Sequence, residues 1–263
     1  MSVQETINSA KKIVIKIGSN TLAQSDGTIN YKFMENFSAQ VAALMAQGKQ
    51  IIIVSSGAQV SGLSTISGWA HKKDVHYRQA LCSIGQVELM NRWRQAFAEH
   101  KIHVGQLLLT KNDFENSHVT LNIRNTMFTL VDENVIPIIN ENDSVATDEF
   151  SIGDNDNLSA LTAKLWNADL LILFSDIDGV FTDNPKTNPD AKLIELVNNV
   201  SELRNQIKIG ETNSFGTGGI ETKLQSAEKC MEYEIPVLLA NGSKENLLSG
   251  LYDGSLKGTL FSK

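Results

Sequence analysis

Short apolar runs recur along the chain and constrain its fold more than any other feature. Each run has four to six residues, is mostly β-branched or leucine, and lacks the alternation of a half-buried strand. Such runs are typical of strands that are covered on both faces, as in a parallel sheet. The runs are Ile13–Ile17, Ile51–Val54, Val104–Leu109, Val135–Ile139, Asp169–Phe174 and Ile235–Ala240.

Segments with helical spacing separate these runs. Between residues 33 and 47, apolar side chains recur every three or four positions, which predicts a helix. The same spacing is found over Arg78–His100, Val119–Asp132, Leu158–Trp166 and Ile220–Tyr233. Strands that alternate with helices predict an α/β fold with a mainly parallel sheet between two helical layers. Because no linker rich in Pro, Gly or Ser interrupts the sequence, we expect residues 1–263 to form a single domain.

Composition excludes several classes of protein. The chain has 23 Lys and Arg against 30 Asp and Glu, a net charge of −7. This acidic balance argues against a dedicated nucleic-acid binder, although a few local lysines suffice to hold a phosphate. The N-terminus is polar, and no apolar run approaches the roughly 18 residues that cross a bilayer. We therefore expect a soluble, cytoplasmic protein that binds neither nucleic acid nor membrane.

Cysteine and histidine give no sign of a metal or disulfide site. Cys82 and Cys230 are far apart and neither has a CxxC neighbour, so we expect both to be buried in a protein from a reducing compartment. The histidines show no metal-ligand spacing, and we expect them to be surface or hydrogen-bonded structural residues. They are His71, His76, His100, His103 and His118.

Small and polar residues follow the predicted strands. In open α/β sheets the ligand crevice lies beyond the carboxyl ends of the strands. Any one such loop needs Gly, Ser or Asn for turn geometry, but repetition after strand upon strand favours a ligand site. The segments are Gly18–Asn20, Ser55–Ala58, Asn140–Asp143, Ser175–Asp176 and Asn241–Gly242.

Lys16 interrupts the first apolar run. A buried ammonium group requires a counter-charge, or its pKa falls. One interpretation is an edge-strand lysine whose amine reaches water. The Gly18-Ser19 turn that follows favours the other interpretation, an anion site, because backbone amides in such a turn can face phosphate oxygens.

A glycine-rich loop, Gly216–Gly219, opens the last predicted long helix. Such a loop exposes backbone N–H groups, and a helix N-terminus adds partial positive charge, which together suit an anion. The loop matches neither a Walker A motif nor a GxGxxG fingerprint, and a flexible surface loop would explain it almost as well on its own. Lys223 lies in the first turn of this helix, and together with Lys16 the loop becomes a candidate two-lysine clamp for a phosphoryl group.

The acidic and amide run at residues 153–157 precedes another predicted helix. Asp156 or Asn157 is a natural N-cap there, but two acids and two amides in succession exceed what one cap requires. An EF-hand does not fit, because Leu158 occupies a ligand position. A GxSxG motif is absent and no Ser–His–Asp order can be inferred, so a hydrolase has little support.

Together these motifs resemble the amino-acid kinase family, and in detail its members that phosphorylate the γ-carboxylate of L-glutamate in proline biosynthesis. The resemblance extends over nearly the whole chain. It rests on KIGSN (16–20), VSSGA (54–58), NENDSVA (140–146), GDNDNLSA (153–160), SDIDGVFTDNP (175–185) and GTGGIETK (216–223).

The resemblance implies a role for each matching residue. Lys16 and Lys223 would contact the transferring phosphate, with Asp156 holding them in place. Ser56, Asp143 and Asn155 would bind glutamate, Asp143 through the α-ammonium group. The residues implied to line the ATP site are Lys16, Ser175, Asp176, Thr217, Gly218, Gly219, Ile220, Glu221, Thr222 and Lys223.

The resemblance also implies a three-layer αβα sandwich around a roughly eight-stranded sheet, with a glutamate-binding N-terminal part and an ATP-binding C-terminal part. Mg²⁺ would accompany ATP through phosphates and waters, so no protein metal ligand is expected. Proline would be a feedback inhibitor and the protein a homo-oligomer. Many relatives carry a C-terminal PUA-type module, which we do not expect here.

The chemistry of the residues agrees with this activity. A γ-carboxylate is ionised at neutral pH and needs no general base, so the task is to bring two anions together. Other acceptors remain open, as in aspartate or acetylglutamate kinases, and so does a non-catalytic amino-acid or nucleotide sensor. Residues 64–75 are polar, and the sequence leaves open whether they form a mobile lid or an oligomer contact.

Overall fold

The fold was analysed in a computed structural model, which describes residues 3–66, 74–146, 154–185, 187–207 and 219–263. Helices and strands alternate through most of this part of the chain. In order, the elements are α1 (Val3–Ser9), β1 (Lys12–Ile17), α2 (Ser19–Leu22), α3 (Tyr31–Ala46), β2 (Gln50–Ser55), α4 (Ala58–Thr65), α5 (Val75–Ala98), β3 (His103–Leu109), the 3₁₀ helix η1 (Lys111–Phe114), α6 (Ser117–Asp132), β4 (Val135–Glu141), α7 (Asp154–Trp166), β5 (Leu170–Ser175), β6 (Leu196–Val197), α8 (Val200–Gln206), α9 (Ile220–Glu232), β7 (Val237–Asn241), α10 (Leu247–Asp253) and β8 (Gly258–Phe261).

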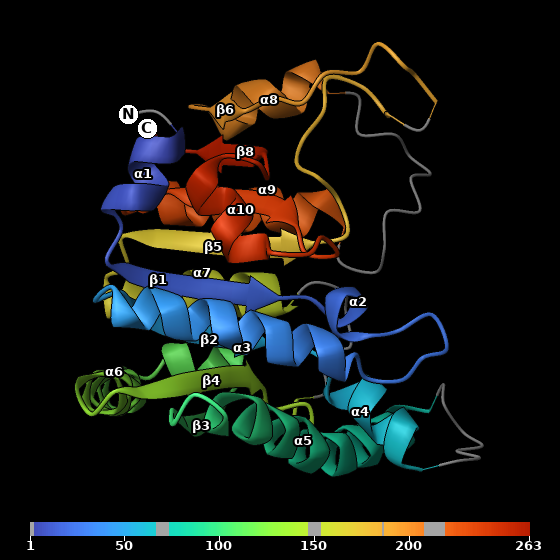
Figure 1. Cartoon of the computed structure of the whole chain (residues 1–263), viewed down its shortest axis with the longest axis vertical. Coiled ribbons are helices and arrows are strands. Elements are labelled where there is room, and N and C mark those ends of the chain that lie inside the picture. Colours follow the sequence, from blue (N-terminus) through green and yellow to red (C-terminus); the bar gives the residue numbers. More distant parts are fainter. Residues whose placement is uncertain (1–2, 67–73, 147–153, 186, 208–218) are drawn as a thin grey trace.

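The strands among these residues form one eight-stranded sheet in the order β3-β4-β2-β1-β5-β7-β8-β6 (Figure 1). Every strand pair from β3 to β7 is parallel, and β8 runs antiparallel to β7. From β1 the chain first builds outwards through β2 and later returns to β1's other side with β5. This reversal creates a topological switch point, the usual place for a ligand crevice in such sheets.

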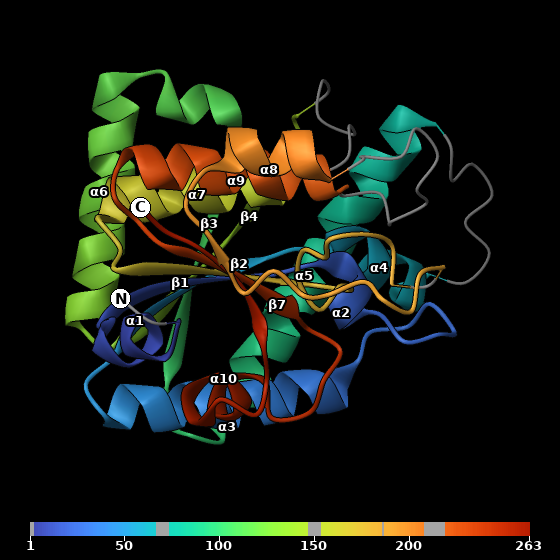
Figure 2. The same cartoon turned by 90° about the horizontal axis from the view of Figure 1, so that it is seen from above.

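Helices cover both faces of the sheet, which confirms the predicted three-layer αβα architecture (Figure 2). One core contains apolar side chains of α1, α3, α5 and α10, including Phe37, Trp93 and Leu247. The other contains those of α6, α7, α8 and α9, including Trp166 and Leu224. Because side chains alternate along a strand, a residue's position in β1 or β2 decides which core it enters.

Strand β1 shows this alternation, which determines the face of the sheet on which Lys16 lies. Ile13, Ile15 and Ile17 enter the core beneath α3, whereas Val14 enters the core beneath α7 and α9. Lys16 has the same parity as Val14 and is only 8% exposed. Since β1 lies between β2 and β5, the interpretation of Lys16 as an edge-strand lysine is wrong.

Five of the six predicted strands are buried on both faces, but β3 is not. His103 and Gln106 of β3 are exposed, because β3 is the strand at the edge of the sheet. The two short strands β6 and β8 were not predicted. They are two and four residues long, too short to give a pattern of their own.

Helix α7 begins earlier than its apolar spacing indicates. It starts at Asp154, so Asp156 and Asn157 lie within its first turn and neither is the N-cap that the sequence suggested. Acidic residues are favourable in the first turn of a helix, where the helix dipole is positive. Because Asp156 is not the N-cap, its side chain can contact residues outside α7.

Cysteines and histidines lie where the sequence predicts. Cys82 and Cys230 are 3% and 1% exposed, and burial raises the pKa of each thiol to about 12. His76, His100, His103 and His118 are exposed, and His71 lies outside the described residues. Within the described ranges, no helix has the length and apolar character needed to cross a membrane.

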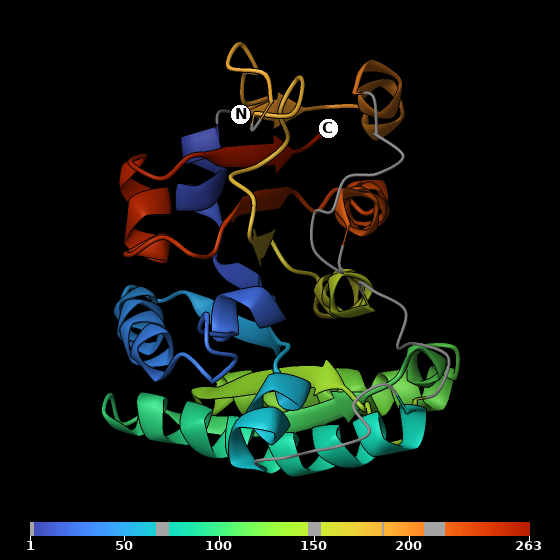
Figure 3. The ribbon, with the colours of Figure 1, turned by 90° about the vertical axis from the view of Figure 1, so that its right-hand side faces the viewer.

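The carboxyl ends of the parallel strands meet at one edge of the molecule. Figure 3 views this edge, with α2 and α4 in front of the sheet. Helices α4 and α5 cross closely there: a Cβ on Gly85 would lie 1.8 Å from the carbonyl oxygen of Ala58, and one on Gly62 would lie 2.3 Å from that of Leu81. The two glycines therefore let α5 approach the segment that follows β2.

Candidate active site

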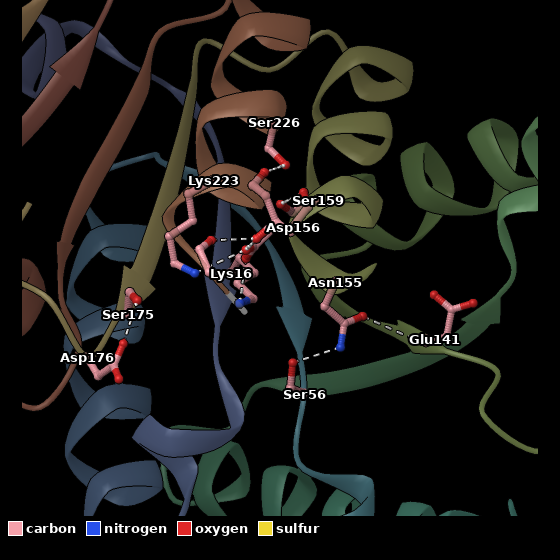
Figure 4. A network of polar contacts seen from close by, with 12 residues as sticks. Lys16, Ser56, Glu141, Asn155, Asp156, Ser159, Ser175, Asp176, Lys223 and Ser226 are labelled. Carbon is pink, nitrogen blue, oxygen red and sulfur yellow. Dashed lines mark hydrogen bonds and ion pairs between the residues drawn. The ribbon is translucent and has the colours of Figure 1, made fainter. Parts of the chain in front are cut away.

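Lys16, Asp156 and Lys223 converge near the carboxyl end of β1 (Figure 4). Lys16 Nζ lies 2.6 Å from Oδ1 of Asp156, and Lys223 Nζ lies 3.3 Å from Oδ2 of the same carboxylate. The three residues come from β1, α7 and α9, which are far apart in sequence. The structure thus brings together two lysines on one acid, as the candidate clamp requires.

Electrostatic interactions in this cluster oppose the effects of burial. Asp156 is fully buried, and burial alone would raise its pKa. The charges of Lys16 and Lys223, with hydrogen bonds from Lys16 and Thr222, outweigh burial and lower the pKa of the carboxyl group. Burial lowers the pKa of Lys223; repulsion by Lys16 adds to this, and the attraction of Asp156 opposes it without cancelling it. Asp156 is therefore held as an anion.

The first turn of α9 positions Lys223. Thr222 Oγ1 donates a hydrogen bond to Oδ2 of Asp156 at 2.9 Å and lies 2.9 Å from the carbonyl oxygen of Gly219, the N-cap residue. Thr222 thus ties the start of α9 to α7. Thr217 and Gly218, which the sequence places in the ATP site, lie outside the described residues, as do Gly153 and Gly216.

An adjoining chain of amide and hydroxyl groups contains two of the predicted substrate residues. Asn155 Nδ2 donates to Ser56 Oγ at 2.7 Å and to Asn140 Oδ1 at 3.0 Å, and Asn155 Oδ1 accepts from the backbone N–H of Glu141 (Figure 4). Because Asn155 directly precedes Asp156 in α7, this chain lies beside the lysine cluster. It joins the ends of β2 and β4 to the start of α7.

Asp143 lies in the turn after β4, near α5. Burial is the main cause of the raised pKa of Cys82 on α5, and the charge of Asp143 adds to it. Ser144 and Ser83 Oγ atoms are 2.7 Å apart, and Gln79 donates to the carbonyl oxygen of Ala146. Helix α5 thus holds the turn that carries Asp143.

Ser175 and Asp176 lie on the other side of the lysine pair, at the end of β5. Ser175 Oγ donates to Asp176 Oδ1 at 3.1 Å, and Asn20 Nδ2 reaches Asp176 Oδ2 at 3.4 Å. The charge of Asp176 also acts on Lys223 and slightly opposes the lowering of its pKa. The two residues predicted for ATP are therefore close to Lys223 and away from Ser56 (Figure 4).

Acidic side chains do not gather into a metal centre in the described ranges. No group of three or more His, Cys, Asp or Glu residues there has the arrangement to hold a metal ion. Asp156, the most buried acid of the site, already contacts two lysines.

Comparisons with known proteins show the family of the chain. The profile of the amino acid kinase family matches residues 11–241. A glutamate 5-kinase of Alkaliphilus metalliredigens is 56% identical over 98% of both chains, and one of Alkaliphilus oremlandii is 54% identical over the same shares. The crystal structure of a UMP kinase from Bacillus anthracis superimposes with a TM-score of 0.64 at 18% identity over 96% of each chain, which shows the shared fold alone.

The chain belongs to the amino acid kinase family, a class of phosphotransferases. Within that family it is similar along almost its full length to the glutamate 5-kinases named above.

Sequence reasoning missed several buried polar residues that support the site. Asn140 and Glu141 are 1% and 6% exposed, although the sequence singled out only Asp143 from the same motif. Gln86 is 8% exposed and accepts a hydrogen bond from Asn140 Nδ2 at 2.8 Å. A signal for Gln86 exists in the sequence, since it shares the apolar face of its helix with Cys82, Leu89 and Trp93.

Proposed function

We propose that this protein transfers the γ-phosphoryl group of ATP to the γ-carboxylate of L-glutamate, which produces γ-glutamyl phosphate and ADP, the first step of proline biosynthesis. The observation that carries the proposal is the buried Lys16–Asp156–Lys223 cluster between two sets of polar residues. The extent of similarity to glutamate 5-kinases supports glutamate as the acceptor.

The lysine cluster suits the phosphoryl group. Two ammonium groups against one carboxylate leave one unit of positive charge in a buried place, where charge interactions are strong. A metaphosphate-like transition state has its negative charge spread over three oxygens, and catalysis depends on positioning and charge stabilisation. In this proposal Lys16 and Lys223 contact those oxygens, and Asp156 keeps the two amines at the correct separation.

Glutamate binds next to this cluster, at Ser56, Asn155 and Asp143. Asn155 lies adjacent to Asp156, so an acceptor held by Asn155 has its side chain directed at the lysine pair. Asp143 takes the α-ammonium group. The γ-carboxylate is ionised at neutral pH and attacks without a general base.

ATP occupies the side of Ser175, Asp176 and the stretch from Thr217 to Lys223. The N-terminus of α9 directs partial positive charge towards the phosphates, and Lys223 lies in its first turn. Mg²⁺ would accompany ATP and would supply positive charge to offset that of the phosphates. Asp176 fits this arrangement because its carboxylate is partly exposed beside Lys223.

The test is formation of a hydroxamate from glutamate, ATP and hydroxylamine, which traps an acyl phosphate. We expect ATP-dependent hydroxamate with L-glutamate and much less with L-aspartate or N-acetylglutamate. Product from one of those acceptors in place of glutamate would assign the protein to another specificity of the family. ATP binding by calorimetry without turnover of any acidic substrate would instead indicate a sensor.

We also propose that the kinase works in the cytoplasm as a homo-oligomer and is inhibited by proline. Two free, buried cysteines are in keeping with a reducing compartment. In this proposal the whole chain acts as one kinase domain, with its glutamate-binding part before α7 and its ATP-binding part after it.

A further inference from the structure

The side-chain amide of Gln86 is buried, and the proposed mechanism gives it no role. It lies on α5 beside Gly85, at the crossing of α4 and α5. Its side chain contacts Asn140 near the carboxyl end of β4, and the residue is 8% exposed. Helix α5 is otherwise outside the set of elements that the motifs assign to substrate.

Hydrogen bonds determine which way the Gln86 amide points. The backbone N–H of Glu141 donates to Oδ1 of Asn140 at 2.9 Å, and a backbone N–H can only donate. Asn140 must therefore use its Nδ2 towards Gln86, whose Oε1 accepts at 2.8 Å. The other corner of the Gln86 amide is consequently the Nε2 donor.

This Nε2 group is buried and has no hydrogen-bond partner among the described residues. A buried donor without an acceptor carries a desolvation penalty, and buried polar groups in proteins are nearly always paired. The other corner of the same amide, Oε1, joins the chain Asn140–Asn155–Ser56, which includes two residues of the proposed glutamate site. An acceptor on a bound substrate would remove the penalty.

We propose that Gln86 is a substrate-binding residue whose Nε2 donates to a carboxylate oxygen of glutamate, at the end remote from the lysine pair. This rests on the proposed function. The chain of contacts runs from Asp156 through its neighbour Asn155 to Asn140 and then to Gln86, so Gln86 is the member farthest along it from Lys16. The α-carboxylate is the group that reaches this end when the γ-carboxylate faces the lysines.

The variant Gln86→Glu tests the donor specifically. It keeps an oxygen for Asn140 but replaces the free donor by an acceptor. At pH 8.5, where the introduced carboxyl is ionised, we expect the KM for glutamate to rise by about thirty-fold or more, as for loss of a hydrogen bond to a charged group plus repulsion. The KM for ATP and kcat should change by less than about threefold, because a contact equal in ground and transition states alters KM alone.

The pH dependence separates binding from a structural role. Burial favours the neutral form of a carboxyl group, so lowering the pH to 6 should protonate a larger share of the introduced carboxyl and restore a donor, and the KM relative to wild type should fall. Gln86→Met, which lacks donor and acceptor, should raise the KM for glutamate about tenfold at both pH values. Gln95→Glu makes the same chemical change at an exposed position of α5 and should leave both KM values unaltered.

Calorimetric titration of wild type and Gln86→Glu with glutamate, without ATP, provides a readout independent of turnover. We expect the same loss of affinity at pH 8.5. If wild type uses and binds glutamate while Gln86→Glu has its KM and Kd within twofold of wild type at both pH values, the assignment of Gln86 is wrong. A wild-type protein that binds no glutamate would refute the proposed function and this inference together.

Discussion

Lys16 Nζ lies 2.6 Å from the Oδ1 atom of Asp156, and the two side chains are 10% and 0% exposed. Removing both charges from water costs energy that their attraction only partly restores, so such a pair contributes little to stability for its own sake. Asp156 also contacts Lys223 through its other oxygen. The arrangement fits the proposed clamp, in which Asp156 positions two amines for contact with a phosphoryl group.

Replacing either lysine should abolish most of the turnover. Lys16→Ala and Lys223→Ala are each expected to lower kcat about 100-fold or more, since each removes a charge contact to the transition state. Steady-state kinetics with glutamate and ATP measure the effect. The control is Lys229→Ala on α9, an exposed lysine that donates to Asn157 and should keep near-normal kcat. Near-normal turnover in a folded Lys16 or Lys223 variant would refute the clamp.

Activity should fall at a lower alkaline pH than the deprotonation of an ordinary lysine would cause. Burial lowers the pKa of Lys223, so its ammonium group loses its proton below the usual value of about 10.4. We expect kcat/KM for ATP to fall with an apparent pKa below that value. Lys223→Arg, which stays charged, should remove this fall, whatever its absolute rate. A wild-type profile that is flat up to pH 10.4 would contradict the prediction.

Unfolding does not account for this alkaline fall. Because the folded pKa of Lys223 lies below the unfolded one, the unfolded chain binds more protons between the two values. The contribution of this group to the free energy of unfolding therefore rises with pH in that window. Circular dichroism across the same pH range serves as the check, and we expect an unchanged spectrum where kcat/KM falls.

Asp156→Asn should destabilise the fold at neutral pH. The substitution leaves two buried ammonium groups without their anion, and breaking a buried pair costs about 3–5 kcal/mol. The pKa of Asp156 is lowered in the folded state, so its stabilisation is present above the unfolded value of about 3.9 and is lost as pH falls through the folded value. Urea unfolding should show a large deficit at pH 7 that shrinks below pH 4. A deficit that is constant with pH would contradict this account.

The two lysines of the cluster could be predicted because each has an unusual local sequence context. Lys16 is a charge in an apolar run, and Lys223 follows a glycine-rich loop. The parallel sheet could also be predicted, because a non-alternating apolar run is a local feature of the sequence. The motif identifies Asp156 as a candidate residue. Its position inside α7 could not be predicted, because polar residues form the first turn and leave no apolar periodicity there.

The helical spacing indicates that Gln86 faces inward, but its partner could not be predicted, because the contact is not local. Gln86 reaches Asn140, 54 residues later in the chain, only because Gly62 and Gly85 permit a close crossing of α4 and α5. Nothing in the spacing of the sequence indicates that crossing. Strands β6 and β8 were missed for a similar reason, since β6 pairs with β8 over just two residues and is defined by that long-range contact.

Asn155→Asp should weaken glutamate binding and leave ATP binding intact. The change keeps the shape of the side chain but replaces its Nδ2 donor to Ser56 and Asn140 by an oxygen. Loss of these donors and repulsion of an anionic substrate should raise the KM for glutamate by about 10- to 100-fold. The matched control is Asn157→Asp on the same helix, whose oxygen contacts the exposed Lys229. Equal effects of the two variants, or a larger effect on the KM for ATP, would contradict the placement of glutamate.

Gly85→Ala should destabilise the protein through the crossing of α4 and α5. The added Cβ would lie 1.8 Å from the carbonyl oxygen of Ala58 and 2.3 Å from the backbone nitrogen of Gly62, so the two backbones must move apart. Overpacking usually costs about 1–3 kcal/mol, and a clash between backbones should reach or exceed the upper end. Urea unfolding measures this loss.

The same substitution should also raise the KM for glutamate, because α4 follows Ser56 and α5 carries Gln86. Val87→Ala, at a position two residues along α5 that is 74% exposed, provides the comparison and should change stability by no more than about 0.5 kcal/mol. If Gly85→Ala keeps the stability of wild type, the close crossing is not required. If it loses stability but keeps the KM for glutamate, the crossing does not position the substrate residues.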